Sequence, residues 1–264
     1  MKIMYVGDVQ AEPGIRVVER LLPGLRKLYG VDLVIAQAEN LSDAKGIRIK
    51  DFKRLQLAGV DFCTGGNWSL HRDEIYPALN DPNIPIIRPA NYPAGTPGLG
   101  HKYIDTEFGK VLVISLLGHI VGRDTDKPVD NALHVIDKIL SDAAGVEKAA
   151  TVVNFHGDFS SEKRIIGYYL DGRVSLVVGD HWHVPTADAS VLPKGTAHIS
   201  DVGMCGSLDS SLGIEFQSVI RRWRDNAHTR NVIETKGRMQ FNAVIAETDQ
   251  KGRALSITQI QEIY

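Results

Sequence analysis

The sequence has few cysteines and no long apolar run. Cys63 and Cys205 are its only cysteines, too few for a disulfide framework or a cysteine-based metal site. No apolar stretch approaches the ~18 residues of a membrane-spanning helix, and the apolar stretch at the amino terminus is too short for a signal peptide. We therefore expect a cytoplasmic protein with two reduced thiols and no membrane partner.

The chain also lacks an excess of charge of either sign. Its 30 basic and 32 acidic side chains give a formal net charge of −2, so strong bulk binding to nucleic acid is not expected. Hydrophobic residues at 43% and charged residues at 23% are ordinary for a globular protein, and no tract of biased composition marks a linker. We expect one domain spanning residues 1–264.

Three common catalytic motifs are missing. The first apolar run is followed by no G-x-G-x-x-G, and the chain contains neither a phosphate-binding P-loop nor a G-x-S-x-G turn. Dinucleotide-binding and serine-hydrolase chemistry each depend on one of these turns. Their absence argues against both classes.

Short apolar runs alternate with amphipathic stretches along most of the chain, which is typical of an α/β protein. The pattern predicts strands at 3–6, 32–37, 60–64, 102–105, 111–117, 150–155, 174–178, 238–246 and 254–262. It predicts helices at 14–28, 49–57, 73–79, 131–141, 162–170 and 214–225. A proline-rich segment at 82–98 separates the first strands, which we expect to form a largely parallel sheet, from a second sheet. The expected architecture is a layered α/β sandwich, with two sheets face to face and helices outside each.

Side chains able to bind a metal follow directly upon five of the expected strands. They are Asp8, Glu39, Asn40, Asn67, His156, His181 and His183. The carboxyl ends of strands in an α/β sheet line one crevice, so these side chains are expected to converge. His181 and His183 flank Trp182 at alternate positions, which predicts both imidazoles on one side.

Two carboxylates, two amides and three imidazoles make a mixed oxygen and nitrogen set that suits Fe, Mn, Zn or Co. Seven ligands are more than one tetrahedral ion needs. If Glu39 bridges, the set can hold two ions ~3.5–4 Å apart, the arrangement that activates water for displacement at phosphorus. The sequence thus favours hydrolysis of a phosphodiester.

Taken singly, several of these residues are equally suited to a purely structural role. Asp8 can serve as the N-cap of the following helix, and Asn67, after two glycines, can be a turn residue. His156 can be a hydrogen-bonded histidine at a strand end. The metal hypothesis depends on the whole set.

The chain resembles the YmdB-like metallophosphoesterases, a branch of the calcineurin-like superfamily, over essentially its whole length. The resemblance is carried by Val6-Gly7-Asp8-Val9, Pro13-Gly14, Ala38-Glu39-Asn40, Gly46-Ile47, Gly66-Asn67, Gly95-Thr96-Pro97-Gly98, Phe155-His156, Ser161-Glu162-Lys163, His181-Trp182-His183-Val184-Pro185-Thr186-Ala187-Asp188 and Asp201-Val202-Gly203-Met204. The long histidine motif is the most specific of these stretches.

The resemblance implies a four-layer αββα sandwich and two divalent or mixed-valence metal ions, with iron expected first and Mn or Zn as alternatives. It implies activity on 2′,3′-cyclic nucleotides and other small phosphodiesters, and a tendency to form homo-oligomers. By analogy one ion is bound by Asp8, Glu39, Asn40 and His183. The other is bound by Glu39, Asn67, His156 and His181.

One departure from the family pattern bears on catalysis. The family has Gly-Asn-His where this chain has Gly66-Asn67-Trp68, and that histidine is the expected proton donor to the leaving group. His71 is a substitute candidate for the donor, with a solvent-facing histidine as the alternative. Asp180, Gly157-Asp158 and the segment 41–45 also differ from the family, which predicts an altered rim of the site.

Two functions follow from these observations. The first is a phosphodiesterase whose turnover is reduced because Trp68 cannot donate a proton. The second is a catalytically silent relative that keeps its metals and binds a nucleotide or a protein partner as a signalling module. Retention of every expected ligand favours the enzyme.

Overall fold

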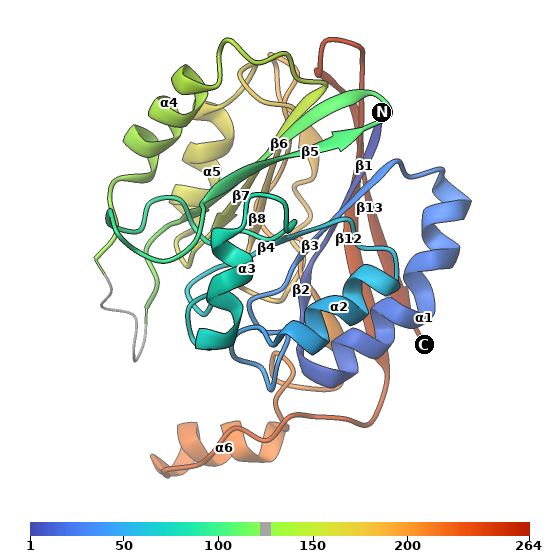
Figure 1. The fold of residues 1–264 in the computed structure, drawn as a ribbon. Coiled ribbons are helices and arrows are strands. Elements are labelled where there is room, and N and C mark those ends of the chain that lie inside the picture. Colours follow the sequence, from blue (N-terminus) through green and yellow to red (C-terminus); the bar gives the residue numbers. More distant parts are fainter. Residues whose placement is uncertain (122–127) are drawn as a thin grey trace.

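The computed structural model describes residues 1–121 and 128–264. Two β-sheets face each other, and helices cover the outer side of each (Figure 1). The four-layer α/β sandwich expected from the sequence is therefore confirmed. Among the described residues, no helix is long and apolar enough to cross a membrane.

The first sheet has seven strands in the order β2-β11-β12-β1-β3-β4, and β13 also pairs with β12. Its strands are β1 Lys2–Val6, β2 Asp8–Val9, β3 Leu33–Gln37, β4 Phe62–Thr64, β11 Met204–Ser207, β12 Met239–Thr248 and β13 Ala254–Ile263. β1, β3 and β4 run parallel, whereas β12 is antiparallel to β1. The first strands are thus parallel to one another as expected, but the sheet as a whole is mixed because the carboxyl-terminal hairpin pairs with β1.

The second sheet has six strands in the order β5-β6-β7-β8-β10-β9. Its strands are β5 His101–Thr106, β6 Gly109–Leu117, β7 Ala150–His156, β8 Leu176–Asp180, β9 Ser190–Val191 and β10 Ala197–Ile199. β6, β7, β8 and β10 are parallel. The carboxyl ends of β7 and β8 consequently lie side by side.

The helices are α1 Ala11–Tyr29, α2 Ile49–Leu57, α3 Tyr76–Asn80, α4 Ala132–Asp142, α5 Ser160–Tyr169 and α6 Phe216–Asp225, and a short 3₁₀ turn, Asp73–Ile75, precedes α3. α1 and α2 pack on the first sheet, and α4 and α5 pack on the second. α6 has no buried residue and stands apart from the sandwich (Figure 1). The predicted helices are all present, with ends that shift by a few residues.

Alternation along the strands divides the apolar core into three layers. In β1, Met4 and Val6 pack toward the helices, and Ile3 and Tyr5 pack between the sheets. The parallel strands are covered on both faces, which explains their nearly continuous apolar sequences. The sequence did not predict β2, β9, β10 and β11, which are only two to four residues long and carry no periodic pattern.

Close backbone approach fixes the end of β8, where the histidine motif begins. A Cβ atom on Gly179 would lie 1.9 Å from the carbonyl oxygen of Ser200, whereas a Cβ on Gly24, in α1, would meet nothing within 4 Å. Glycine is therefore required at position 179 and merely tolerated at position 24.

We expect Gly179→Ala to lower the free energy of unfolding by about 3 kcal/mol, because the new methyl group must push two backbone segments apart. Gly24→Ala is the matched control and should raise it by about 0.5–1 kcal/mol, because alanine favours the helix. Urea unfolding followed by circular dichroism measures both values. Equal stability of the two variants would contradict the close approach at Gly179.

Candidate metal centre

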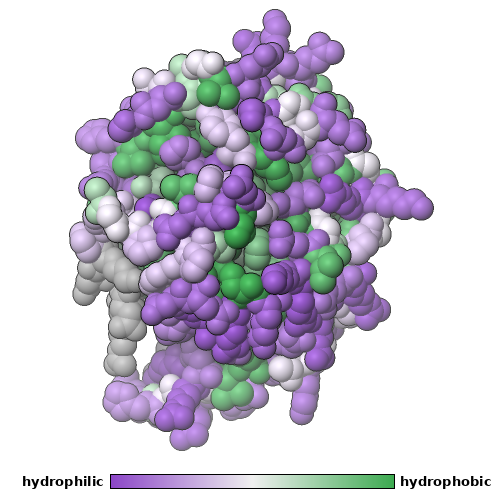
Figure 2. Space-filling view, viewed as in Figure 1, coloured by the Kyte–Doolittle hydropathy of each residue, from purple (hydrophilic) through white to green (hydrophobic). Residues whose placement is uncertain are grey.

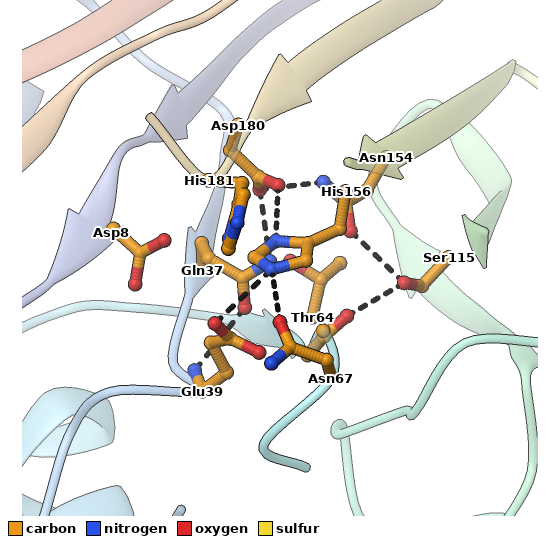
Figure 3. A network of polar contacts seen from close by, with 12 residues as sticks. Asp8, Gln37, Glu39, Thr64, Asn67, Ser115, Asn154, His156, Asp180 and His181 are labelled. Carbon is orange, nitrogen blue, oxygen red and sulfur yellow. Dashed lines mark hydrogen bonds and ion pairs between the residues drawn. The ribbon is translucent and has the colours of Figure 1, made fainter. Parts of the chain in front are cut away.

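The structure brings the seven candidate ligands together at the carboxyl ends of strands from both sheets. Asp8 begins β2, Glu39 and Asn40 follow β3, Asn67 follows β4, His156 ends β7, and His181 and His183 follow β8. Figure 3 shows several of these side chains turned toward a common centre. The convergence expected from strand topology is what the structure shows.

One half of the cluster is built around His156. Its Nε2 atom lies 3.1 Å from Glu39 Oε1 and 2.9 Å from Asn67 Oδ1. The His181 ring is edge-on to it, with 4.5 Å between the ring centroids. Ligand atoms of Glu39, His156 and His181 all lie within 4.8 Å of one another, which is compatible with binding to a single ion.

The other half is built around Asp8. Asn40 Nδ2 donates to Asp8 Oδ1 at 3.0 Å and lies 3.3 Å from His183 Nε2. Asp8 Oδ2 is buried and has no hydrogen-bond partner in the described part of the chain, and His183 Nε2 lies 3.5 Å from it. A buried carboxylate oxygen without a partner is costly, and a bound cation would remove that cost. A half-turn of its amide would let Asn40 offer an oxygen to the same cation.

Glu39 connects the two halves. One carboxylate oxygen, Oε1, lies 3.3 Å from Asn40 Nδ2, and the other accepts a hydrogen bond of 2.9 Å from the Trp68 backbone N–H. Burial alone would raise the pKa of Glu39, but the positive charge of His156 and His181 holds this pKa below its ordinary value. Glu39 is therefore a buried carboxylate that stays ionised.

His156 is oriented from behind by Asp180. The Asp180 carboxylate accepts from His156 Nδ1 at 2.7 Å, which leaves Nε2 facing the centre (Figure 3). Burial alone would lower the pKa of His156, but Glu39 and Asp180 raise it well above its ordinary value. The two carboxylates thus favour a positive charge here, whether a proton or a metal ion.

Asp180 was expected at the rim of the site, and that expectation was wrong. The residue is fully buried, because β8 continues through position 180 and places it beside His156 in the parallel β7–β8 register. Its carboxylate also accepts from Tyr5 Oη at 3.1 Å, Gln37 Nε2 at 2.9 Å and Asn154 Nδ2 at 2.6 Å. The alignment of position 180 with His156 in the neighbouring parallel strands is the signal that could have placed Asp180 behind this histidine.

The two histidines of the long motif reach the centre through an unusual backbone. His181 and His183 have φ angles of 99° and 63°, so simple strand alternation does not place them. Between them, Trp182 donates its indole N–H to the Asp158 carbonyl oxygen at 3.0 Å, and its ring lies over the buried Lys163 ammonium, 3.8 Å away. Anchoring Trp182 in this way fixes the turn that carries both imidazoles.

Trp68 adjoins the centre through its backbone N–H, and His71 lies against the Trp68 ring. The Trp68 ring is half-buried, its centroid lies 4.1 Å from Lys45 Nζ, and the exposed His71 ring is edge-on to it with 5.4 Å between the centroids. Asp158, another departure from the family pattern, is partly exposed and places Oδ1 3.4 Å from His181 Nε2. Burial alone would raise the pKa of Asp158, but its hydrogen bond with His181 holds the pKa below its ordinary value.

We expect Asp180→Ala to lower the free energy of unfolding by about 3–5 kcal/mol, because it leaves buried donors from several strands without an acceptor. Asp158→Ala is the control: it also removes a carboxylate beside a site histidine, but one that water reaches, and it should change stability by less than ~1 kcal/mol. Urea unfolding of both variants provides the comparison. A small effect of Asp180→Ala would show that the buried network adds nothing to stability.

The chain is similar in sequence and fold to proteins of a known family. The model of the family described as "YmdB-like protein" matches residues 4–260. The 2′,3′-cyclic-nucleotide 2′-phosphodiesterase of Bacillus subtilis (strain 168) is 36% identical over 262 residues, which cover 98% of this chain and 96% of that protein. A solved structure of a Thermus thermophilus protein, described as hypothetical, is 35% identical with a TM-score of 0.90, covering 100% of this chain and 99% of the other. A Mycoplasma pneumoniae structure described as a novel phosphatase is 28% identical with a TM-score of 0.92, covering 100% of this chain and 93% of the other. This chain is therefore an enzyme and belongs to the YmdB-like family of metallophosphoesterases.

Proposed function

We propose that this enzyme hydrolyses small phosphodiesters, with 2′,3′-cyclic nucleotides as the substrate class, at a centre that binds two metal ions. The name of the Bacillus subtilis relative supports the substrate class. The observation that carries the two-ion proposal is the position of Glu39 between two groups of side chains. One of these groups contains Asp8 Oδ2, a buried oxygen that accepts no hydrogen bond from the described residues. A buried ionised carboxylate in that position is suited to bridging two cations.

The proposed ligands of one ion are Asp8, Glu39, Asn40 and His183, and those of the other are Glu39, Asn67, His156 and His181. Oxygen and imidazole ligands suit iron, the expected metal, as well as Mn and Zn. When bound, such a pair supplies the positive charge that holds a phosphodiester and lowers the pKa of a water molecule.

Other residues of the chain hold these ligands in place and limit the reaction. Asp180 keeps Nδ1 of His156 occupied, so that Nε2 is always the atom presented. Trp68 stands at the position of the family's proton donor, and its indole N–H is not released at neutral pH. Substrates with poor leaving groups should therefore react slowly, while activated aryl diesters, which need little protonation, react faster.

We expect the purified protein to contain ~2 metal equivalents per chain, since seven ligands exceed the needs of one ion. Asp8→Ala combined with His181→Ala removes one ligand from each half and should abolish metal binding. Asp209→Ala, which removes an exposed carboxylate elsewhere, is the control and should retain the metal. Plasma mass spectrometry gives the counts, and protein that neither contains metal nor takes it up on reconstitution would contradict the proposal.

We expect bis-p-nitrophenyl phosphate to be cleaved much faster than 2′,3′-cyclic AMP, and Trp68→His to reduce this difference. General acid catalysis contributes typically ~10²–10⁴-fold, so the variant should raise cyclic nucleotide turnover by at least about tenfold and change aryl diester turnover little. Steady-state kcat for both substrates measures the ratio.

The control for this experiment is Trp68→Phe, which replaces the indole without adding a proton donor and should not accelerate cyclic nucleotide turnover. His71→Ala tests the substitute donor. If it lowers cyclic nucleotide turnover alone, His71 donates the proton. If the wild type cleaves both substrates equally fast, another acid is present and Trp68 is not rate-limiting.

A further inference from the structure

A cavity lined by Trp68 lies next to the candidate metal centre. It has a volume of about 670 Å³ and is lined by Lys45, Trp68, Arg222, Asn226, Ala227, His228, Thr229, Arg230 and Asn231. We call it the Trp68 pocket. One wall comes from the loop after β3 and the turn after β4, and the other comes from α6 and the segment that follows it. This volume lies within the range of small-molecule binding sites.

The lining of the Trp68 pocket is basic. Lys45, Arg222 and Arg230 contribute cations, and none of the nine lining residues is acidic. Within the described ranges none of these three cations forms an ion pair, whereas the nearby Arg48 and Arg72 both pair with Asp43. In the space-filling view, the lower part of the molecule around α6 is coloured mostly for hydrophilic residues (Figure 2). A cluster of unpaired cations on a chain of net charge −2 indicates an anionic ligand.

One of the three cations, Arg222, is held in a fixed orientation, whereas Arg230 is exposed. Arg222 is half-buried, and its guanidinium donates to Asn231 Oδ1 at 2.6 Å and to Thr229 Oγ1 at 3.2 Å. These neutral partners orient the group without neutralising it. A guanidinium fixed in this way is suited to binding a phosphate.

Trp68 joins this pocket to the metal centre. Its backbone N–H donates to Glu39 Oε2 at 2.9 Å, while the residue also lines the pocket. A ligand in the pocket would therefore extend from a phosphodiester held at the centre. An aromatic ring beside cations is a combination that binds nucleotides, because a base stacks on the ring and the cations take the phosphate. Lys45 Nζ lies over one face of the Trp68 ring, 4.1 Å from its centroid, so a base would have to take the other face.

We propose that the Trp68 pocket binds the base and a second phosphate of the substrate. The preferred substrate class is then a 2′,3′-cyclic phosphate that carries a further phosphate on its 5′ side, rather than the free nucleoside cyclic phosphate. Both a 5′-phosphorylated mononucleotide and the end of an oligoribonucleotide present this chemistry. The inference rests on the proposed function, since it assumes that the cyclic phosphate is held at the metal centre.

The test compares kcat/KM of the holoenzyme for three substrates: 2′,3′-cyclic AMP, its 5′-phosphorylated form, and a triribonucleotide ending in a 2′,3′-cyclic phosphate. We expect the added phosphate to raise kcat/KM by roughly tenfold, as two partly exposed charge-assisted contacts allow. Arg222→Gln with Arg230→Gln should remove this advantage, because both cations of the proposed phosphate site are lost. Arg221→Gln with Arg224→Gln removes the same charge outside the pocket lining and should preserve the advantage.

The possible outcomes distinguish a failure of the pocket inference from a failure of the proposed function. An advantage for both phosphorylated substrates supports a mononucleotide or an oligonucleotide end, and an advantage for the triribonucleotide alone supports the oligonucleotide. Equal kcat/KM for all three substrates, or equal losses in the pocket and control variants, would overturn the inference. If the wild type hydrolyses none of them, the proposed function fails instead. In that case, calorimetry with adenosine 5′-phosphate tests the pocket separately. We expect binding to be roughly tenfold weaker in the Arg222→Gln/Arg230→Gln variant and unchanged in the Arg221→Gln/Arg224→Gln control.

Discussion

The buried carboxylate of Asp180 is the point at which the two sheets are tied together. It accepts hydrogen bonds from Tyr5 in β1 and Gln37 in β3, which belong to the first sheet, and from Asn154 and His156 in β7 of the second. A buried ion is tolerated only when such partners surround it, so the position of each sheet constrains the other. The candidate metal centre lies directly on this junction, and its geometry therefore depends on how the layers pack.

The network continues toward the turn after β4. Asn154 Oδ1 accepts from the Ser115 hydroxyl at 2.9 Å, and that hydroxyl also lies 2.8 Å from the Gly65 carbonyl oxygen. Gly65 precedes the turn that carries Asn67 and Trp68. A continuous set of polar contacts thus connects the histidine at the end of β7 with the turn that adjoins both the candidate metal centre and the Trp68 pocket. Rigid support of this kind is what a site made of loop residues needs.

The sequence predicted those features that depend on local pattern. The helices, the longer strands and the seven side chains after strand ends could be read from periodicity and position, because strand ends meet at one edge of a sheet. What it could not provide depends on pairing between distant segments. The antiparallel contact of β12 with β1 and the burial of Asp180 both result from such contacts. The positive φ angles of His181 and His183 had no signal in the sequence pattern either. The sequence did not predict the Trp68 pocket for the same reason, because α6, which forms one of its walls, lies about 150 residues from Trp68 along the chain.

Gly66 has almost no freedom to change. A Cβ atom there would lie 2.4 Å from Glu39 Oε2 and 2.5 Å from the His156 ring, so the space for the centre exists only because this residue has no side chain. Its neighbour Asn67 places Oδ1 2.9 Å from His156 Nε2 in the candidate centre, and Trp68 forms a wall of the adjoining cavity. One short turn thus combines a position that accepts only glycine, Gly66, with a position whose side chain faces a cavity, Trp68. Exchange of the Trp68 side chain would therefore reshape the adjoining cavity without touching the packing around Gly66.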